Sequence, residues 1–169
     1  THVPNGPTLN LLGTREPEVY GTTTLPQIQA MCHEAARQHP LRFLQTNAEH
    51  QMVDWIHEAI DDGSAILINP AGLTFRSIPV LDALKMVRVP VIELHISNIH
   101  KREAIYQHSL VSSAVTAVIA GLVVIALVVG ANILWTGWGL LRDSVSGLLD
   151  ERLSDEDIDE VVSVLASHE

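Results

Sequence analysis

The sequence contains a single cysteine and few basic residues, and each scarcity argues against a class of structure or partner. Cys32 has no second cysteine to pair with, so we predict no intrachain disulfide and expect a buried, small apolar side chain rather than a nucleophile. Lys and Arg number 10 against 20 Asp and Glu, and they form no basic stripe. We therefore predict no nucleic-acid partner, because nucleic-acid phosphates require clustered cations. An anionic small molecule can still be held locally.

A secretory leader is also missing from the start of the sequence, where residues 1–10 lack a basic stretch followed by an apolar run. We therefore expect a cytoplasmic protein. With 169 residues, the chain has room for one main domain and an appendage. Composition places the boundary near residue 122, because residues 1–122 carry 8 basic and 11 acidic side chains whereas residues 123–169 carry 2 and 9.

Charged side chains are absent between Ala104 and Leu141, and from Ala114 onwards the chain is almost continuously apolar. Two interpretations stay open for residues 114–141. The run is long enough for a membrane-compatible helix, which needs about 20 apolar residues and would make the protein membrane-associated. The alternative is a buried helix with a buried strand or an oligomer contact. Beyond this run, residues 154–165 begin with acidic residues and predict a short amphipathic helix.

Short β-branched runs alternate with helical patterns in the first part of the chain. Residues 66–70 and 89–95 read as buried strands of a parallel sheet. Apolar residues at helical spacing predict three helices, over residues 25–38, 51–59 and 77–86. The pattern predicts an α/β fold with helices on both faces of a parallel sheet. Ligands gather beyond the carboxyl ends of such strands, which makes Asn69 and His95 candidate site residues.

The block from Asn5 to Gly21 is rich in turn residues and carries Arg15 and Tyr20 five positions apart. A loop can bring an arginine beside a phenol, and a nearby positive charge lowers the pKa of a tyrosine from about 10 towards a value suited to a general base. Taken alone, the same residues favour a solvated arginine and a packed tyrosine, and the other blocks of the sequence change that balance.

Further blocks follow in a fixed order: QTN at 45–47, VDWIHEA at 53–59, NPAGLTFRS at 69–77, LDAL at 81–84 and ELHISNIHKRE at 93–103. Together with the first block, they resemble the type II 3-dehydroquinate dehydratases over residues 1–122. The resemblance implies a flavodoxin-like fold, assembled from trimers into a homododecamer. It also implies an anti elimination of water from 3-dehydroquinate to 3-dehydroshikimate through an enolate, in the shikimate pathway of aromatic amino-acid biosynthesis.

The resemblance assigns the acid and base of this reaction. Tyr20 matches the base that removes the proton beside the ketone, and Arg15 matches the cation that keeps that phenol acidic. His95 matches the acid that protonates the departing hydroxyl, a task suited to imidazole because it exchanges protons near neutral pH. Glu93 either orients His95 or is a solvated strand end, and both interpretations stay open.

The resemblance also assigns groups that hold the substrate. Asn69, Ile96 and Ser97 match substrate-binding groups, notably for its carboxylate, and Asp82 matches a residue contributed within the assembled trimer. We predict no cofactor and no metal, because His100 and His108 lack the paired spacing with Cys, Asp or Glu that metal sites use.

Three positions depart from the family pattern. Thr8 stands where the family has an asparagine that stabilises the enolate oxygen, Phe75 where it has a substrate-binding histidine, and Tyr106 where it has an arginine that grips the substrate. One lost electrostatic donor can lower a rate by about 10² to 10³, so an impaired enzyme and a catalytically dead binding homologue both stay open. In addition, Pro4 falls in the expected first strand, where it removes a hydrogen-bond donor.

Residues 126–162 are similar to the last transmembrane helix and the following segment of cation diffusion facilitator transporters. The helices that bind the ion in that family are absent, so transport is not implied. A natural fusion, a chimera and an accidental similarity all stay open. If this tail inserts into a membrane, it would tether the first domain and interfere with its symmetric assembly.

Overall fold

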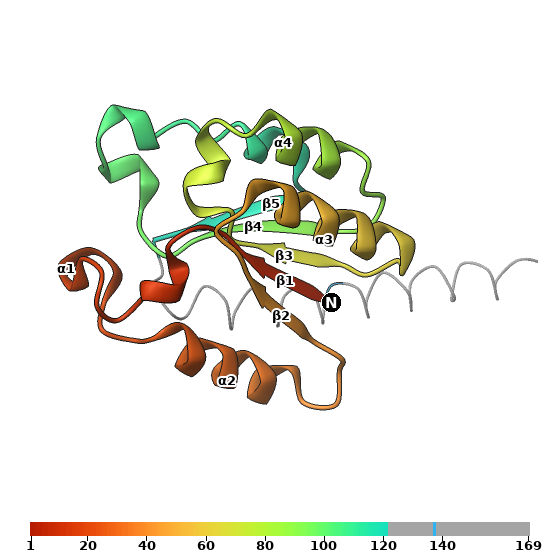
Figure 1. The fold of residues 1–169 in the computed structure, drawn as a ribbon, viewed down its shortest axis with the longest axis horizontal. Coiled ribbons are helices and arrows are strands. Elements are labelled where there is room, and N and C mark those ends of the chain that lie inside the picture. Colours follow the sequence, from red (N-terminus) through yellow and green to blue (C-terminus); the bar gives the residue numbers. More distant parts are fainter. Residues whose placement is uncertain (122–136, 138–169) are drawn as a thin grey trace, which may run out of the picture. The chain divides into compact units, whose positions relative to one another are not determined.

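Five parallel strands form one sheet in the order β2-β1-β3-β4-β5 (Figure 1). The computed structural model describes residues 1–121 together with Gly137. The strands are β1 (His2–Asn5), β2 (Arg42–Gln45), β3 (Ile66–Ile68), β4 (Val91–His95) and β5 (Ala117–Ala120). The predicted parallel α/β sheet is confirmed, and its strand order is that of flavodoxin-like folds.

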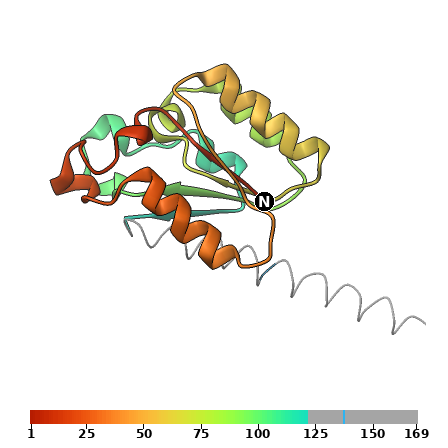
Figure 2. The ribbon, with the colours of Figure 1, turned by 60° about the horizontal axis from the view of Figure 1, so that its bottom comes forward.

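Helices cover both faces of this sheet. They are α1 (Pro17–Tyr20), α2 (Leu25–Ala36), α3 (Glu49–Asp61) and α4 (Ile78–Lys85), with short 3₁₀ helices at Leu9–Leu11, Ala71–Phe75, Ile99–Lys101, Ala104–Tyr106 and Val111–Ala114. Helix α2 lies on one side of the strands, and α3 and α4 lie on the other (Figures 1 and 2). The three predicted helices are therefore confirmed, with ends shifted by one or two residues.

The sequence sets the start of two of these helices. Thr24 precedes α2 and shares a capping box with Gln27, whose Oε1 accepts the Thr24 backbone N–H at 2.9 Å. Ser77 precedes α4, and its side chain accepts the Val80 N–H at 3.1 Å.

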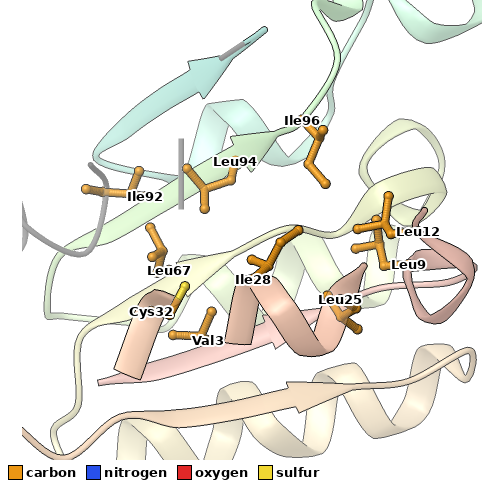
Figure 3. Close-up of a cluster of buried hydrophobic side chains, with 10 residues drawn as sticks. All are labelled: Val3, Leu9, Leu12, Leu25, Ile28, Cys32, Leu67, Ile92, Leu94 and Ile96. Atoms are coloured by element: carbon orange, nitrogen blue, oxygen red, sulfur yellow. The ribbon is translucent and has the colours of Figure 1, made fainter. Parts of the chain in front are cut away.

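Alternating strand residues fill two cores, one on each face of the sheet. Leu67, Ile92 and Leu94 pack with Ile28 and Cys32 of α2 (Figure 3). The residues between them point to the α3 and α4 side, where Ile66, Ile68 and Val91 join the second core. Cys32 is fully buried, and burial raises the pKa of its thiol to about 11. The prediction of a core cysteine is confirmed, since such a thiol stays protonated and unreactive at neutral pH.

The apolar run that begins at residue 114 does not start as a membrane helix. Residues 117–120 form strand β5, in which Val118 pairs with Glu93 and Ala120 with His95. For these residues the membrane-helix interpretation is wrong and the strand of the alternative interpretation is confirmed, because their backbone groups bond to β4. The predicted burial is also wrong for Ala117 and Val118, which are exposed.

The remaining predictions for the second part of the chain lie outside the described residues. They concern the rest of the apolar helix, the acidic helix at 154–165, the second domain at 123–169 and the transporter-like segment at 126–162. Among residues 1–121, no helix is long and apolar enough to cross a membrane.

Pro4 interrupts the hydrogen bonding between β1 and β3. These strands pair at His2 and Ile66, and the next contact is an isolated bridge between Asn5 and Asn69. The Pro4 carbonyl accepts the Asn69 N–H at 3.0 Å, but its nitrogen has no proton to donate. The predicted loss of a donor in the first strand is confirmed.

A valine at position 4 would restore this donor. Both Pro4→Val and the control Pro7→Val relax the unfolded chain, but only the first adds a donor between paired strands. We expect the free energy of unfolding of Pro4→Val to exceed that of Pro7→Val by about 0.5–1.5 kcal/mol, the net value of one hydrogen bond. Urea denaturation of both variants measures the difference, and equal values would contradict the explanation.

Candidate active site

The loop after β1 is held against the end of β3. Gly6 donates its N–H to the Asn69 carbonyl at 2.8 Å. A Cβ at position 6 would overlap the carbonyl oxygen of Pro70, so only glycine permits this approach. The loop that carries Arg15 and Tyr20 is thereby anchored beside the strand end that carries Asn69.

A cavity open to solvent lies at the carboxyl ends of the strands. Six of the predicted site residues line it: Arg15, Tyr20, Asn69, His95, Ile96 and Ser97. They come from the loop after β1 and from the ends of β3 and β4, as expected for a parallel sheet.

The hydroxyl of Tyr20 accepts a hydrogen bond from Nη1 of Arg102, which also lines the cavity. Burial opposes the charge of Arg102, but the bond to Tyr20 outweighs it and raises the pKa of the guanidinium above its usual value. Arg15 lies differently, with its guanidinium carbon 5.2 Å from the centre of the Tyr20 ring. Its nitrogens bond to Glu16, at 3.2 Å, and to the hydroxyl of Thr8.

His95 ends β4 and is 4% exposed. Its Nε2 lies 2.8 Å from Oε1 of Glu93, which is fully buried. Three hydroxyls, those of Thr74, Ser109 and Ser112, also donate to the Glu93 carboxylate. Burial alone would raise the pKa of Glu93, but the bonds from His95, Ser112 and Thr74 hold it below its usual value. Glu93 is therefore a charged partner of His95, and the alternative of a solvated strand end is wrong.

Asn69 lines the cavity and carries a donor without a partner. The residue is 3% exposed, and its Oδ1 accepts the Ala71 N–H at 3.3 Å. Its Nδ2 is buried and has no hydrogen-bond partner. A buried amide without a partner is costly, so this nitrogen is placed to bind an acceptor on a ligand.

Comparison with known proteins decides the family. The family model for "Dehydroquinase class II" matches residues 1–134. The chain belongs to the class II dehydroquinase family. The match extends past residue 122, so the first residues of the transporter-like segment fall within the dehydroquinase region.

Relatives and solved structures agree with this dehydroquinase match. The chain is 52% identical over 120 residues to "3-dehydroquinate dehydratase 2" of Agrobacterium fabrum, covering 70% of this chain and 82% of the relative. It is 47% identical over 123 residues to "3-dehydroquinate dehydratase" of Salinispora arenicola, covering 72% and 86%. The type II dehydroquinase structure from Propionibacterium acnes has a TM-score of 0.78 at 42% identity, covering 80% of this chain and 94% of that one.

The three departures from the dehydroquinase pattern occupy different environments. Phe75 and Tyr106 line the cavity and contact each other, with ring centres 5.5 Å apart. Thr8 is exposed, is not among the residues that line the cavity, and accepts a hydrogen bond from Arg15. It also adopts a left-handed φ of 66°, which is unfavourable for a β-branched residue.

Asp82 is the one predicted site residue that does not join the cavity. It lies on α4 with its side chain 63% exposed, and it pairs with Lys85 at 3.2 Å. Among residues 1–121, no group of three His, Cys, Asp or Glu side chains could hold a metal ion.

Arg102 is the site residue that the sequence prediction missed. It stands seven positions after His95, within the block at 93–103, but nothing local marks it as a partner of Tyr20. The available signal was an arginine in a block that follows a strand end, where phosphate- or carboxylate-binding side chains often lie.

The turn beside Asn69 is strained at Ala71, which has a left-handed φ of 51°. Its neighbour Gly72 does not have a positive φ, so its backbone does not require glycine. We expect exchange of the two residues, Ala71→Gly with Gly72→Ala, to raise the free energy of unfolding by about 1–2 kcal/mol. Ala71→Gly relieves the backbone strain at position 71. Gly72→Ala restricts the unfolded chain, and its new Cβ meets no atom in the folded state.

Chemical denaturation of the exchange variant and of both single variants measures these contributions. Gly63→Ala is the matched control. A Cβ at Gly63 meets no atom, as at Gly72, but Gly63 has a φ of 65°, which strains an alanine. We therefore expect Gly63→Ala to lower the free energy of unfolding. A gain at Gly63, or no gain from either single change, would contradict the explanation.

Proposed function

We propose that this protein is a hydro-lyase that converts 3-dehydroquinate to 3-dehydroshikimate. The observation that carries the proposal is one cavity with a phenol bonded to an arginine and an imidazole bonded to a buried carboxylate. These groups form a base and an acid of the kind that elimination of water needs. Relatives about 50% identical that are named 3-dehydroquinate dehydratase support the same reaction.

The first step is removal of a proton by Tyr20. Its phenolate oxygen takes the proton from the carbon beside the ketone, and the electron pair of that bond forms an enolate. Arg102 donates to the phenol oxygen and stabilises negative charge there before the transfer. Arg15 lies over the face of the Tyr20 ring and adds positive potential, rather than a direct bond to the hydroxyl.

The second step is loss of the hydroxyl. The enolate electrons return to form the carbon–carbon double bond, the carbon–oxygen bond breaks, and His95 gives its proton to the departing oxygen, which leaves as water. Nε2 of His95 is hydrogen-bonded to Glu93. The other ring nitrogen, Nδ1, is therefore the one that gives its proton to the ligand. The negative carboxylate stabilises the protonated imidazole that the step requires.

The substrate is held by groups around this acid and base. The unpartnered Nδ2 of Asn69 donates to the substrate, and Ile96 and Ser97 contribute backbone and side-chain groups towards its carboxylate. Asp82 reaches a site only from another copy of the chain, because it lies outside the cavity of its own copy. A trimer-based dodecamer, as the family resemblance implies, would bring such a copy to the site. The protein then acts in the shikimate pathway, with no cofactor.

A second candidate is a binding homologue without turnover. Phe75 and Tyr106 favour it, because both line the cavity at positions where the family carries a histidine and an arginine. A ligand that raises the melting temperature without being converted would support this candidate.

The test is the ultraviolet absorbance of the conjugated enone product after addition of 3-dehydroquinate. We expect turnover by the wild type and a large loss in His95→Ala. His100→Ala is the matched control, because His100 is exposed and lies outside the cavity. No absorbance change at high enzyme concentration, with the fold intact, would reject the proposal. Restoring the family residues together, as Thr8→Asn, Phe75→His and Tyr106→Arg, measures how much activity the departures remove.

A further inference from the structure

One wall of the cavity is formed by a continuous series of rings and one cation. The ring of Phe75 lies 6.3 Å from that of His95, with 23° between their planes. It meets the ring of Tyr106 edge-on, at 5.5 Å and 72°. The guanidinium carbon of Arg102 lies 4.5 Å from the centre of the Tyr106 ring and 5.5 Å from that of Tyr20. We call the pair Phe75 and Tyr106 the aromatic wall.

Much of the remaining lining is aliphatic. Leu9, Ile96 and Ile99 also line the cavity, and each is at most 5% exposed. Polar side chains also line the cavity, namely Arg15, Tyr20, Asn69, His95, Ser97 and Arg102. The cavity therefore combines these six polar side chains with the aromatic wall and aliphatic surfaces.

This arrangement fits one shape of ring better than another. A planar unsaturated ring carries its polar substituents at the edge and presents two apolar faces, which pack against aromatic and aliphatic side chains. A saturated ring carries substituents above and below its mean plane. A hydroxyl pressed against Phe75 would lose its water without gaining a partner, because a phenyl ring offers no donor and only a weak acceptor.

We propose that this cavity selects planar, unsaturated ring carboxylates over saturated ones, and that the aromatic wall sets the preference. The amide of Asn69 and the hydroxyl of Ser97 then serve the carboxylate and hydroxyl groups at the edge of the ring. The inference rests on the proposed function only in taking this cavity as the ligand site. One consequence is that the enone product, with its flattened ring, is retained more strongly than the substrate.

Two probes that differ only in the ring test this preference. They are 3,4-dihydroxybenzoate and 3,4-dihydroxycyclohexane-1-carboxylate, which carry the same substituents on a planar and a saturated ring. Isothermal titration calorimetry on the full chain gives a Kd for each. We expect the wild type to bind the planar probe about tenfold tighter, which is the scale of one good aromatic contact.

Variants assign the preference to the aromatic wall. In Phe75→His with Tyr106→Arg, we expect the ratio of the two Kd values to fall to about one. Tyr106→Phe keeps the ring and is the matched control, so it should keep the ratio. Thermal melting of each variant establishes that it is folded, and both positions are only partly buried.

Each outcome decides the proposal. A wild-type ratio near one, or a preference for the saturated probe, overturns it. A planar preference that survives the double substitution overturns the assignment to Phe75 and Tyr106. Turnover of 3-dehydroquinate with a ratio near one would reject this inference alone, whereas a planar preference without turnover would reject the proposed function alone.

Discussion

Replacing Arg102 with methionine is expected to lower kcat for dehydration by about 10² to 10³, the scale of one lost electrostatic donor in an active site. The guanidinium donates directly to the phenol oxygen proposed as the base. Methionine keeps much of the aliphatic volume and removes the charge and the donor. The loss should appear in kcat measured at saturating substrate, because the contact stabilises the base rather than the bound substrate.

Arg15→Met is the matched control for this result. Arg15 lies over the Tyr20 ring at 5.2 Å, and its nitrogens bond to Glu16 and Thr8 instead of the Tyr20 hydroxyl. We expect a loss in kcat of no more than about tenfold, as for one cation–π contact. A larger loss from Arg15→Met than from Arg102→Met would contradict the assignment of Arg102 as the partner of the base.

Glu93→Gln is expected to affect both catalysis and stability. An amide at this position has no negative charge with which to stabilise a protonated His95, so we expect kcat to fall by about 10². The hydroxyls of Thr74, Ser109 and Ser112 would also lose a charged acceptor. We expect a decrease of about 1.5–3 kcal/mol in the free energy of unfolding at neutral pH, as for hydrogen bonds to a charged group.

The lowered pKa of Glu93 predicts how the effect of Glu93→Gln on stability changes with pH. The folded state holds the pKa of Glu93 below its ordinary value of 4.5, so ionised Glu93 stabilises the fold above that pH. The stabilisation is lost as the pH falls through the lowered pKa. The difference in unfolding free energy between the wild type and Glu93→Gln should therefore shrink in acid, as measured by urea denaturation over a pH series.

Glu58→Gln provides the control for the acid series. Its carboxylate is exposed and pairs with Arg42, so we expect a change within about 0.5 kcal/mol. A difference for Glu93→Gln that stayed constant, or grew, on acidification would show that the carboxylate does not contribute through its charge.

The fold was predictable from sequence where apolar residues follow a clear period. Ile66 to Ile68 and Val91 to His95 are strands because β-branched runs bounded by Pro and Asn suit a sheet covered on both faces. The residues at 117–120 were harder, since an apolar run without period fits a helix or a strand equally well. What decides them is pairing with β4, which no local pattern records.

The same limit applies to the active site. Asn69 and His95 were predictable because Asn69 directly follows strand β3 and His95 ends strand β4. Arg102 was not, because its partner Tyr20 lies 82 residues earlier and the contact depends on how two loops meet. The position of Asp82 on the far side of α4 follows equally from packing, since its helix turns Val80, Ala83 and Leu84 towards the core.

Strand β5 holds the backbone of His95, the proposed acid, through hydrogen bonds. Its pairing ends where Ala120 lies opposite His95, and the N–H of Gly121 donates to the His95 carbonyl at 3.1 Å. The backbone of His95 is therefore clamped by the last bonds of the outermost strand. The hydrogen-exchange rate of the Gly121 amide reports whether its bond to the His95 carbonyl is formed. Fraying of β5 would make the position of His95 less fixed, although no residue of β5 lines the cavity.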